Sequence, residues 1–197
     1  MKQEAIRQAL IGGTIHVIAQ NGLDGATTKK ISQETGINEA YIYRHFEDKE
    51  DMFVHAFTQL DQELADNLSE HIALMYVSDL KVEERCWILF SAVWRFLLGN
   101  SNKCTCYMQY YYSPYFRKYS AEEHRRIYKQ IEEDITPAFQ EGVNVWQMLN
   151  FMLDVMLASA VKVFAGDMAD NDKTAAQVFR LIYGAVEPQL AWTQKLA

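Results

Sequence analysis

Residues 27–53 read TTKKISQETGINEAYIYRHFEDKEDMF, and this stretch decides the fold of the first part of the chain. Thr27 or Thr28 can cap a short helix, which Gly36 ends because glycine adopts φ > 0 without strain. Asn38 offers the N-cap of a second short helix directly afterwards. Two short helices joined by a tight turn that contains glycine predict a helix-turn-helix unit.

Helical spacing continues on both sides of this unit. Before it, a helix with apolar side chains at helical spacing is expected to stop at Asn21-Gly22. After it, Asp48 and Asp51 are spaced as a carboxylate N-cap and an acidic residue three positions on, which predicts a helix that runs well past Leu64.

The rest of the chain also predicts helices. The sequence has only 9 Gly and 3 Pro, and it lacks runs of alternating β-branched residues. Helices are expected over 82–98, 103–112, 121–140, 145–165 and 173–193, with a kink or early end at Pro137 and at Pro188. The sequence therefore predicts an all-α protein, with a three-helix head in residues 1–47 and a bundle of about six helices in residues 48–197.

Composition and charge exclude several classes of protein. Hydrophobic residues make up 49% and charged residues 23%, which is typical of a globular chain. The net charge of −7, from 19 basic and 26 acidic residues, argues against a protein that coats nucleic acid by bulk charge. Residues 1–51 hold 6 basic and 8 acidic side chains, so any binding to DNA must depend on a few placed residues.

The N-terminal segment does not have the pattern of a membrane span or a signal peptide. Its longest uncharged stretch, 8–23, contains several polar residues, and Glu4 lies where a signal peptide would be basic. We therefore expect a cytoplasmic protein, in which Cys86, Cys104 and Cys106 are free thiols.

The stretch 27–53 closely resembles the DNA-binding head of the TetR/AcrR family of bacterial transcriptional regulators. The family pattern of a Thr pair, an apolar-small pair, Gly-apolar, Leu-Tyr-x-His-Phe and Lys-Glu-x-Leu is met in order, over roughly the first 55 residues. The sequence departs from it mildly, with Ser32 and Thr35 where Ala is usual, Asn38 where Ser is usual and Ala40 where Gly is usual.

The resemblance implies which side chains meet DNA. Phosphate contacts are expected from Thr28, Lys29, Tyr43, His45 and Lys49. Contacts to base edges are expected from residues at or near the start of the recognition helix, at Glu39, Ala40, Tyr41 and Arg44. Asn38, the expected cap of this helix, is counted with the DNA-binding residues.

The resemblance also implies an effector-binding bundle, and this part of the chain is rich in aromatic and methionine residues. These residue types suit a hydrophobic or planar aromatic ligand, although they could equally fill an ordinary core. The candidate ligand-binding residues are Trp87, Phe90, Trp94, Tyr107, Met108, Tyr111, Tyr128, Met148, Phe151 and Met152.

Polar residues of the helix expected over 145–165 fall near one stripe, which predicts a mostly buried helix. A family-like homodimer, in which the last two long helices pair with their copies, would cover it on two sides. Asp154 lies on this stripe, where it is either a solvent-facing residue or an anchor for a cationic ligand.

Catalytic signatures, such as a Gly-rich phosphate loop or a His-Glu-x-x-His motif, are absent, so we expect no enzyme, no cofactor and no metal site. The function predicted is that of a homodimeric regulator, most often a repressor, released from a palindromic operator by a small effector. Two alternatives remain open. One is a redox or metal sensor that uses Cys104 and Cys106, and the other is a helical ligand-binding protein that does not bind DNA.

Overall fold

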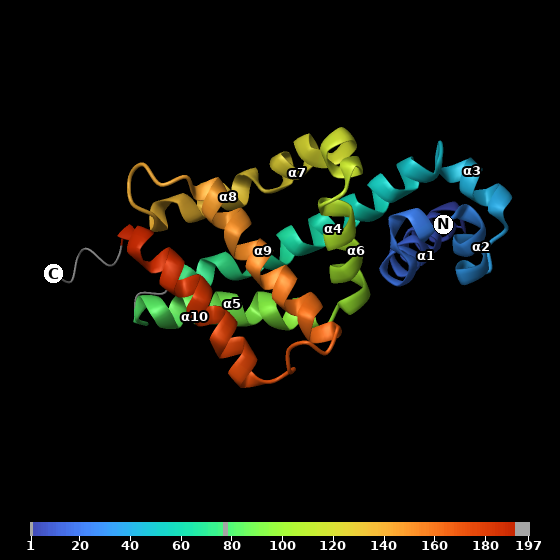
Figure 1. The fold of residues 1–197 in the computed structure, drawn as a ribbon. Helices are drawn as coiled ribbons and strands as arrows, with labels where there is room; N and C mark the ends of the chain where they lie inside the picture. Colours follow the sequence, from blue (N-terminus) through green and yellow to red (C-terminus); the bar gives the residue numbers. More distant parts are fainter. Residues whose placement is uncertain (1, 77–78, 192–197) are drawn as a thin grey trace. The chain divides into compact units, whose positions relative to one another are not determined.

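The computed structural model describes residues 2–76 and 79–191, and helices dominate it (Figure 1). The α-helices are α1 (Lys2–Gly25), α2 (Thr28–Thr35), α3 (Ile42–His45), α4 (Lys49–Ile72), α5 (Val82–Leu98), α6 (Ser101–Tyr111), α7 (Ala121–Ile127), α8 (Lys129–Ile135), α9 (Val145–Phe164) and α10 (Asp172–Val186). Within the described ranges, extended pairing is limited to an isolated bridge between Phe139 and Leu190. The predicted all-α fold is confirmed.

The helices pack into two compact units. The first comprises Met1–Glu63 and Asn102–Arg126, and the second comprises Leu64–Ser101 and Ile127–Ala197. We call them the head unit and the bundle unit. The boundary expected between residues 47 and 48 separates a DNA-binding domain from an effector-binding domain. The two units are defined by packing and not by function, and the expected domain boundary therefore stays a prediction.

The predicted caps set the helix boundaries of the head unit. The Thr27 hydroxyl accepts a hydrogen bond from the amide of Lys30 at 3.2 Å, and Gly36 ends α2 with φ 67°. The Asn38 side chain accepts from the amide of Ala40 at 2.9 Å. The second short helix differs from the expectation in one respect, because a 3₁₀ turn over Glu39–Tyr41 precedes α3.

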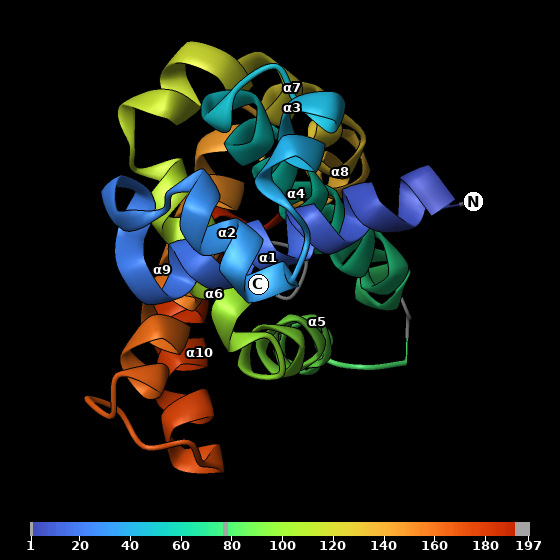
Figure 2. The same ribbon diagram turned by 90° about the vertical axis from the view of Figure 1, so that its right-hand side faces the viewer.

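Helix α1 packs against α2 through a glycine (Figures 1 and 2). A Cβ atom placed on Gly13 would lie only 2.2 Å from Cγ2 of Thr35, so this approach requires glycine. The predicted stop at Asn21-Gly22 is partly confirmed: Gly22 breaks the helical path with φ 73°, but a further helical turn follows it as far as Gly25.

Helix α4 begins as predicted. The Asp48 carboxylate accepts a hydrogen bond from the amide of Asp51 at 2.7 Å, and the Asp51 carboxylate accepts from the amide of Glu47 at 3.0 Å. These bonds satisfy amides that have no partner within the helix. The helix continues to Ile72, beyond Leu64 as expected.

One predicted helix, 121–140, is not continuous. A π-helical turn over Phe116–Ser120 leads into α7, a turn at Tyr128 separates α7 from α8, and a 3₁₀ turn over Thr136–Ala138 follows. The early end near Pro137 was expected, because proline removes a backbone donor. The break at Tyr128 was not expected, because no glycine or proline marks it.

In the bundle unit, α5, α9 and α10 pack against one another (Figures 1 and 2). The bounds of α5 agree with the prediction, and α9 ends one residue short of it. Helix α10 ends at Val186, two residues before Pro188, which confirms the expected early end. The predicted end at Thr193 lies outside the described residues.

Candidate functional sites

The recognition segment of the head unit presents aromatic and cationic side chains to solvent. Tyr43 is 60% exposed and Tyr41 is 39% exposed, although both are large aromatic residues. The Arg44 guanidinium lies 4.9 Å from the centroid of the Tyr41 ring, a cation–π geometry that orders both side chains. Ile42 between them is fully buried, so it fixes which face of α3 points outward.

Polar partners hold other predicted DNA contacts in place. The Thr28 hydroxyl donates a hydrogen bond to the carboxylate of Glu39. The Asn38 side chain caps the 3₁₀ turn that leads into α3, so its role is to begin this turn. The Lys49 ammonium lies 5.4 Å from the centroid of the Phe53 ring at the start of α4.

The remaining predicted contacts differ in exposure. Lys29 and Ala40 are exposed, whereas His45 is half-buried. All ten predicted DNA-contacting residues thus belong to the α2–α3 region and the first residue of α4. Their binding to DNA stays a prediction.

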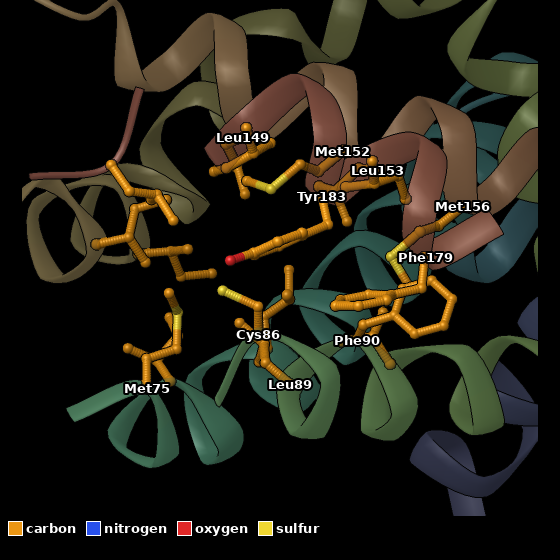
Figure 3. A pocket seen from close by; sticks show the side chains of 18 of the residues that line it. Met75, Cys86, Leu89, Phe90, Leu149, Met152, Leu153, Met156, Phe179 and Tyr183 are labelled. Carbon is orange, nitrogen blue, oxygen red and sulfur yellow. The ribbon is translucent and has the colours of Figure 1, made fainter. Parts of the chain in front are cut away.

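The bundle unit contains an apolar cavity of about 90 Å³ (Figure 3). Its walls come from α4, α5, α8, α9 and α10, together with the turns that follow α4, α8 and α10. They include Leu68, Ile72, Met75, Cys86, Leu89, Phe90, Val93, Ile131, Ile135, Phe139, Leu149, Met152, Leu153, Met156, Phe179, Ile182, Tyr183, Val186 and Leu190. A dry apolar space of this size favours an apolar ligand over water.

The structure does not gather the predicted ligand-binding residues into one pocket. Phe90 and Met152 line the cavity, but Met148 and Phe151 line a separate open groove beside the 140–144 loop. The other six predicted residues do not line the cavity. In the bundle unit, Trp94 and Tyr128 are buried and Trp87 is partly exposed. Tyr107, Met108 and Tyr111 belong to the head unit. Of the ten predicted residues, Phe90 and Met152 thus line this cavity, and ligand binding by the predicted set stays a prediction.

Most of the cavity wall was missed because it is aliphatic. Residues such as Leu89, Ile131 and Ile182 have the same sequence pattern as ordinary core residues. No sequence signal distinguishes a side chain that faces a cavity from one that faces a neighbour. Cys86 and Tyr183 could have been found, because each places a thiol or a hydroxyl on a helix face that is otherwise apolar.

Comparisons with known proteins agree with the head and with the fold. Residues 10–56 match the model of the family described as bacterial regulatory proteins, tetR family. This stretch is similar to the tetR family. Over 65 residues the chain is 31% identical to the transcriptional repressor AcnR of Corynebacterium efficiens, and it has the same identity to AcnR of Corynebacterium glutamicum. These matches span 33% of this chain and 35% of the length of each relative.

Solved structures extend the likeness in fold beyond residues 10–56. A tetR-family transcription regulator from Shewanella sp. PV-4 has a TM-score of 0.73 at 19% identity, covering 94% of this chain and 98% of the other. FadR of Bacillus subtilis, solved in complex with stearoyl-CoA, has a TM-score of 0.68 at 19% identity, covering 89% and 96% of the two chains. At these identities the likeness shows the shared fold.

The head unit also contains a buried polar cluster, centred on Asp61 of α4, that the sequence did not reveal. Asp61 is 1% exposed, and its carboxylate accepts hydrogen bonds from the Tyr107 hydroxyl at 3.0 Å and from Nδ1 of His124 at 2.9 Å. The rings of Phe57 and Phe116 pack around it. A hydrogen-bonded carboxylate at this depth ties α4 to α6 and α7 within the head unit.

The thiols are in environments that suppress their reactivity. Burial raises the pKa of Cys104 to about 12, although the Lys103 charge lowers it slightly, and burial raises the pKa of Cys106 to about 12. The reactive and metal-binding form of cysteine is the thiolate. Among the described residues, no group of three or more His, Cys, Asp or Glu side chains is placed to hold a metal ion.

Helix α9 is long and apolar enough to cross a membrane by length and composition, but only 28% of its most apolar 18-residue window is buried within the chain. The prediction of a mostly buried helix is therefore not met by one chain alone. Phe151 of α9 is 37% exposed and Leu181 of α10 is 70% exposed. Asp154 is half-buried, as are Asn150 and Ala158 of the predicted polar stripe.

Proposed function

We propose that this chain is a cytoplasmic transcriptional regulator that binds a palindromic operator as a homodimer and releases it when a small apolar effector fills the bundle cavity. The observation that carries the proposal is the recognition segment of the head unit. Thr27 caps α2 and Asn38 caps the 3₁₀ turn that leads into α3. Ile42 is buried, while Tyr41, Tyr43 and Arg44 are exposed. A recognition helix of this kind presents its first residues to base edges in the major groove.

The acidic net charge is compatible with this role, because specific contacts are local. Tyr43 and Lys49 would donate to phosphates, and Arg44 has the donors to bind either a guanine or a phosphate. Glu39 would suit a cytosine amino group, and its bond to Thr28 would hold the carboxylate in a fixed orientation.

Dimerisation is proposed through α9 and α10. Each of these helices leaves an apolar side chain exposed, Phe151 and Leu181, in addition to the small residues Gly184 and Ala185. Pairing with a second copy would remove this apolar surface from water. Sedimentation should show a dimer for the parent and a monomer for Leu181→Arg, and a monomeric parent would refute this part of the proposal.

Transmission between effector and DNA is proposed through α4. This one helix carries Lys49 at its start, whereas Leu68 and Ile72 near its end line the cavity. A dimer must hold its recognition helices about 34–36 Å apart to contact two half-sites one turn of DNA apart, so a small rotation of each head would weaken binding. Repression as the outcome is supported by the name of the AcnR relatives.

The proposal is tested by binding of the purified protein to DNA that flanks its own gene. Sequence-specific binding is expected, and Lys49→Ala should weaken it for all sequences alike while reducing the salt slope by about 0.9, the contribution of one phosphate contact. Lys129→Ala, which removes an exposed lysine of α8, is the matched control and should change neither quantity. Equal effects of the two variants would contradict the phosphate assignment.

A further inference from the structure

The cavity of the bundle unit has one polar end. Among its described lining residues, only Cys86 and Tyr183 carry a thiol or a hydroxyl. Figure 3 shows the Cys86 thiol and the Tyr183 hydroxyl directed toward each other from α5 and α10. The Tyr183 hydroxyl donates a hydrogen bond to Oε1 of Glu187 at 3.1 Å, so a carboxylate lies directly behind this end.

Two glutamates and one arginine act on the two polar groups. Burial raises the pKa of Cys86 to about 11, with Arg85 lowering it and Glu187 and Glu83 raising it. The pKa of Tyr183 is raised by burial and then by Glu187 and Glu83. Both groups are therefore uncharged at neutral pH. The Arg85 guanidinium is directed to the carbonyl oxygen of Leu80 at 2.8 Å, so it is already engaged there.

The helix ends add to this electrostatic bias. Tyr183 lies in the last turn of α10, and Glu187 directly follows this helix. The free carbonyl groups of a helix C-terminus carry partial negative charge, which favours a cation nearby. The positive end of α5 is already offset by Glu83 and Glu84 in its first turn.

We propose that the cavity selects amphiphiles whose apolar body ends in a cationic primary amine, and that Glu187, Tyr183 and Cys86 form the subsite for this head group. The inference rests on the proposed function, because it names the chemical class of the effector. The amine would donate hydrogen bonds to the Tyr183 hydroxyl oxygen and the Glu187 carboxylate, and the apolar wall would cover the chain. Carboxylates, which bring negative charge, are disfavoured at the same end.

The test uses three probes with the same eight-carbon chain, octylamine, octan-1-ol and octanoate, added to the full chain without DNA. Calorimetry at low salt and pH 7 should rank octylamine first, octan-1-ol second and octanoate last, with a ratio of about tenfold or more between the first and the last. Because the chains are identical, the ranking reports the head group. A ranking with octanoate first, equal affinities for all three probes, or no binding of any of them overturns the proposal.

Variants locate the subsite. Glu187→Gln should remove most of the preference for octylamine over octanoate, while octan-1-ol binds as before. Asp170→Asn makes the same change of charge before the other end of α10 and should leave the ranking intact. If both variants alter the ranking equally, the preference reflects the overall charge of the protein, and the subsite assignment is wrong.

Met152→Trp and, on a second wall, Leu89→Trp should fill the cavity and abolish binding of all three probes, with folding checked by thermal unfolding. If a folded filled variant still binds octylamine, the subsite lies elsewhere.

Failure of this inference and failure of the proposed function are distinguishable, because operator binding is measured separately. Release of the operator by octanoate but not by octylamine would refute the inference and leave the regulator intact.

Discussion

The head unit contains an aromatic cluster of Phe57, Tyr107, Tyr110, Tyr111 and Phe116, which packs beside the buried polar cluster. This aromatic cluster and the cavity of the bundle unit are both interior regions, yet they are built in opposite ways. In the cluster, the rings of Phe57 and Tyr110 stack with their centroids 4.6 Å apart, and the Tyr107 hydroxyl donates a hydrogen bond to the buried Asp61 carboxylate. In the cavity, aliphatic and methionine side chains leave about 90 Å³ unfilled. Large rings fill space and satisfy a polar group, whereas flexible side chains leave room for a ligand.

Because of this difference, we expect the aromatic cluster to contribute to the stability of the fold and the cavity to contribute to ligand binding. Residues of the aromatic cluster satisfy one another, so changing them should cost free energy of unfolding. Residues of the cavity wall border empty space, so enlarging one of them should cost ligand affinity. The sequence alone placed Tyr107 and Met152 in the same predicted pocket, and they belong to these two different regions.

The largest expected effect is on the buried cluster. Asp61→Ala removes the acceptor of both Tyr107 and His124, and we expect it to lower the free energy of unfolding by about 3–5 kcal/mol. Glu63→Ala, on the same helix, breaks the part-exposed pair with Lys103 and should cost less than about 1 kcal/mol. Urea denaturation measures both values, and similar costs would show that the cluster is not a structural centre.

The next effect concerns ligand affinity. Met152→Trp should abolish binding of octylamine while leaving operator binding and stability close to those of the parent, because the indole would occupy the cavity. Tyr111→Phe, in the aromatic cluster, should leave octylamine affinity unchanged. Calorimetry distinguishes the two regions. If Tyr111→Phe lowers octylamine affinity and Met152→Trp does not, octylamine binds in the head unit and not in the cavity.

The smallest effect is expected at the thiols. Burial raises the pKa of Cys104 and Cys106 to about 12, so both are protonated thiols at pH 7. The double variant Cys104→Ser/Cys106→Ser should bind operator like the parent, and brief peroxide treatment should leave the parent's operator affinity unchanged. Loss of DNA binding on oxidation, absent in the double variant, would favour the redox alternative.

The head could be predicted closely because its boundaries depend on local chemistry. Thr27, Gly36, Asn38 and Asp48 each satisfy or terminate a helix through groups only a few residues away. The long helices of the bundle unit were also predictable from their periodicity and from Pro188. The break at Tyr128 was missed because no local residue type demands it.

The cavity and the buried cluster could not be predicted, because both depend on contacts between residues far apart in the sequence. His124 reaches Asp61 across 63 positions, and nothing near either residue marks the pair. Tyrosines of the 107–116 stretch were expected to line a ligand pocket because of their number. In the structure, Tyr107 and Tyr110 are instead used for packing and hydrogen bonding.

The most direct test is the operator affinity of the parent protein, measured by fluorescence anisotropy with and without octylamine at a concentration shown by calorimetry to be saturating. A coupling of about 1–3 kcal/mol predicts that octylamine weakens operator binding by about 5- to 150-fold, and that operator weakens octylamine binding by the same factor. Met152→Trp should bind operator normally and show no response. An operator affinity that is unchanged when octylamine fills the cavity would contradict the account.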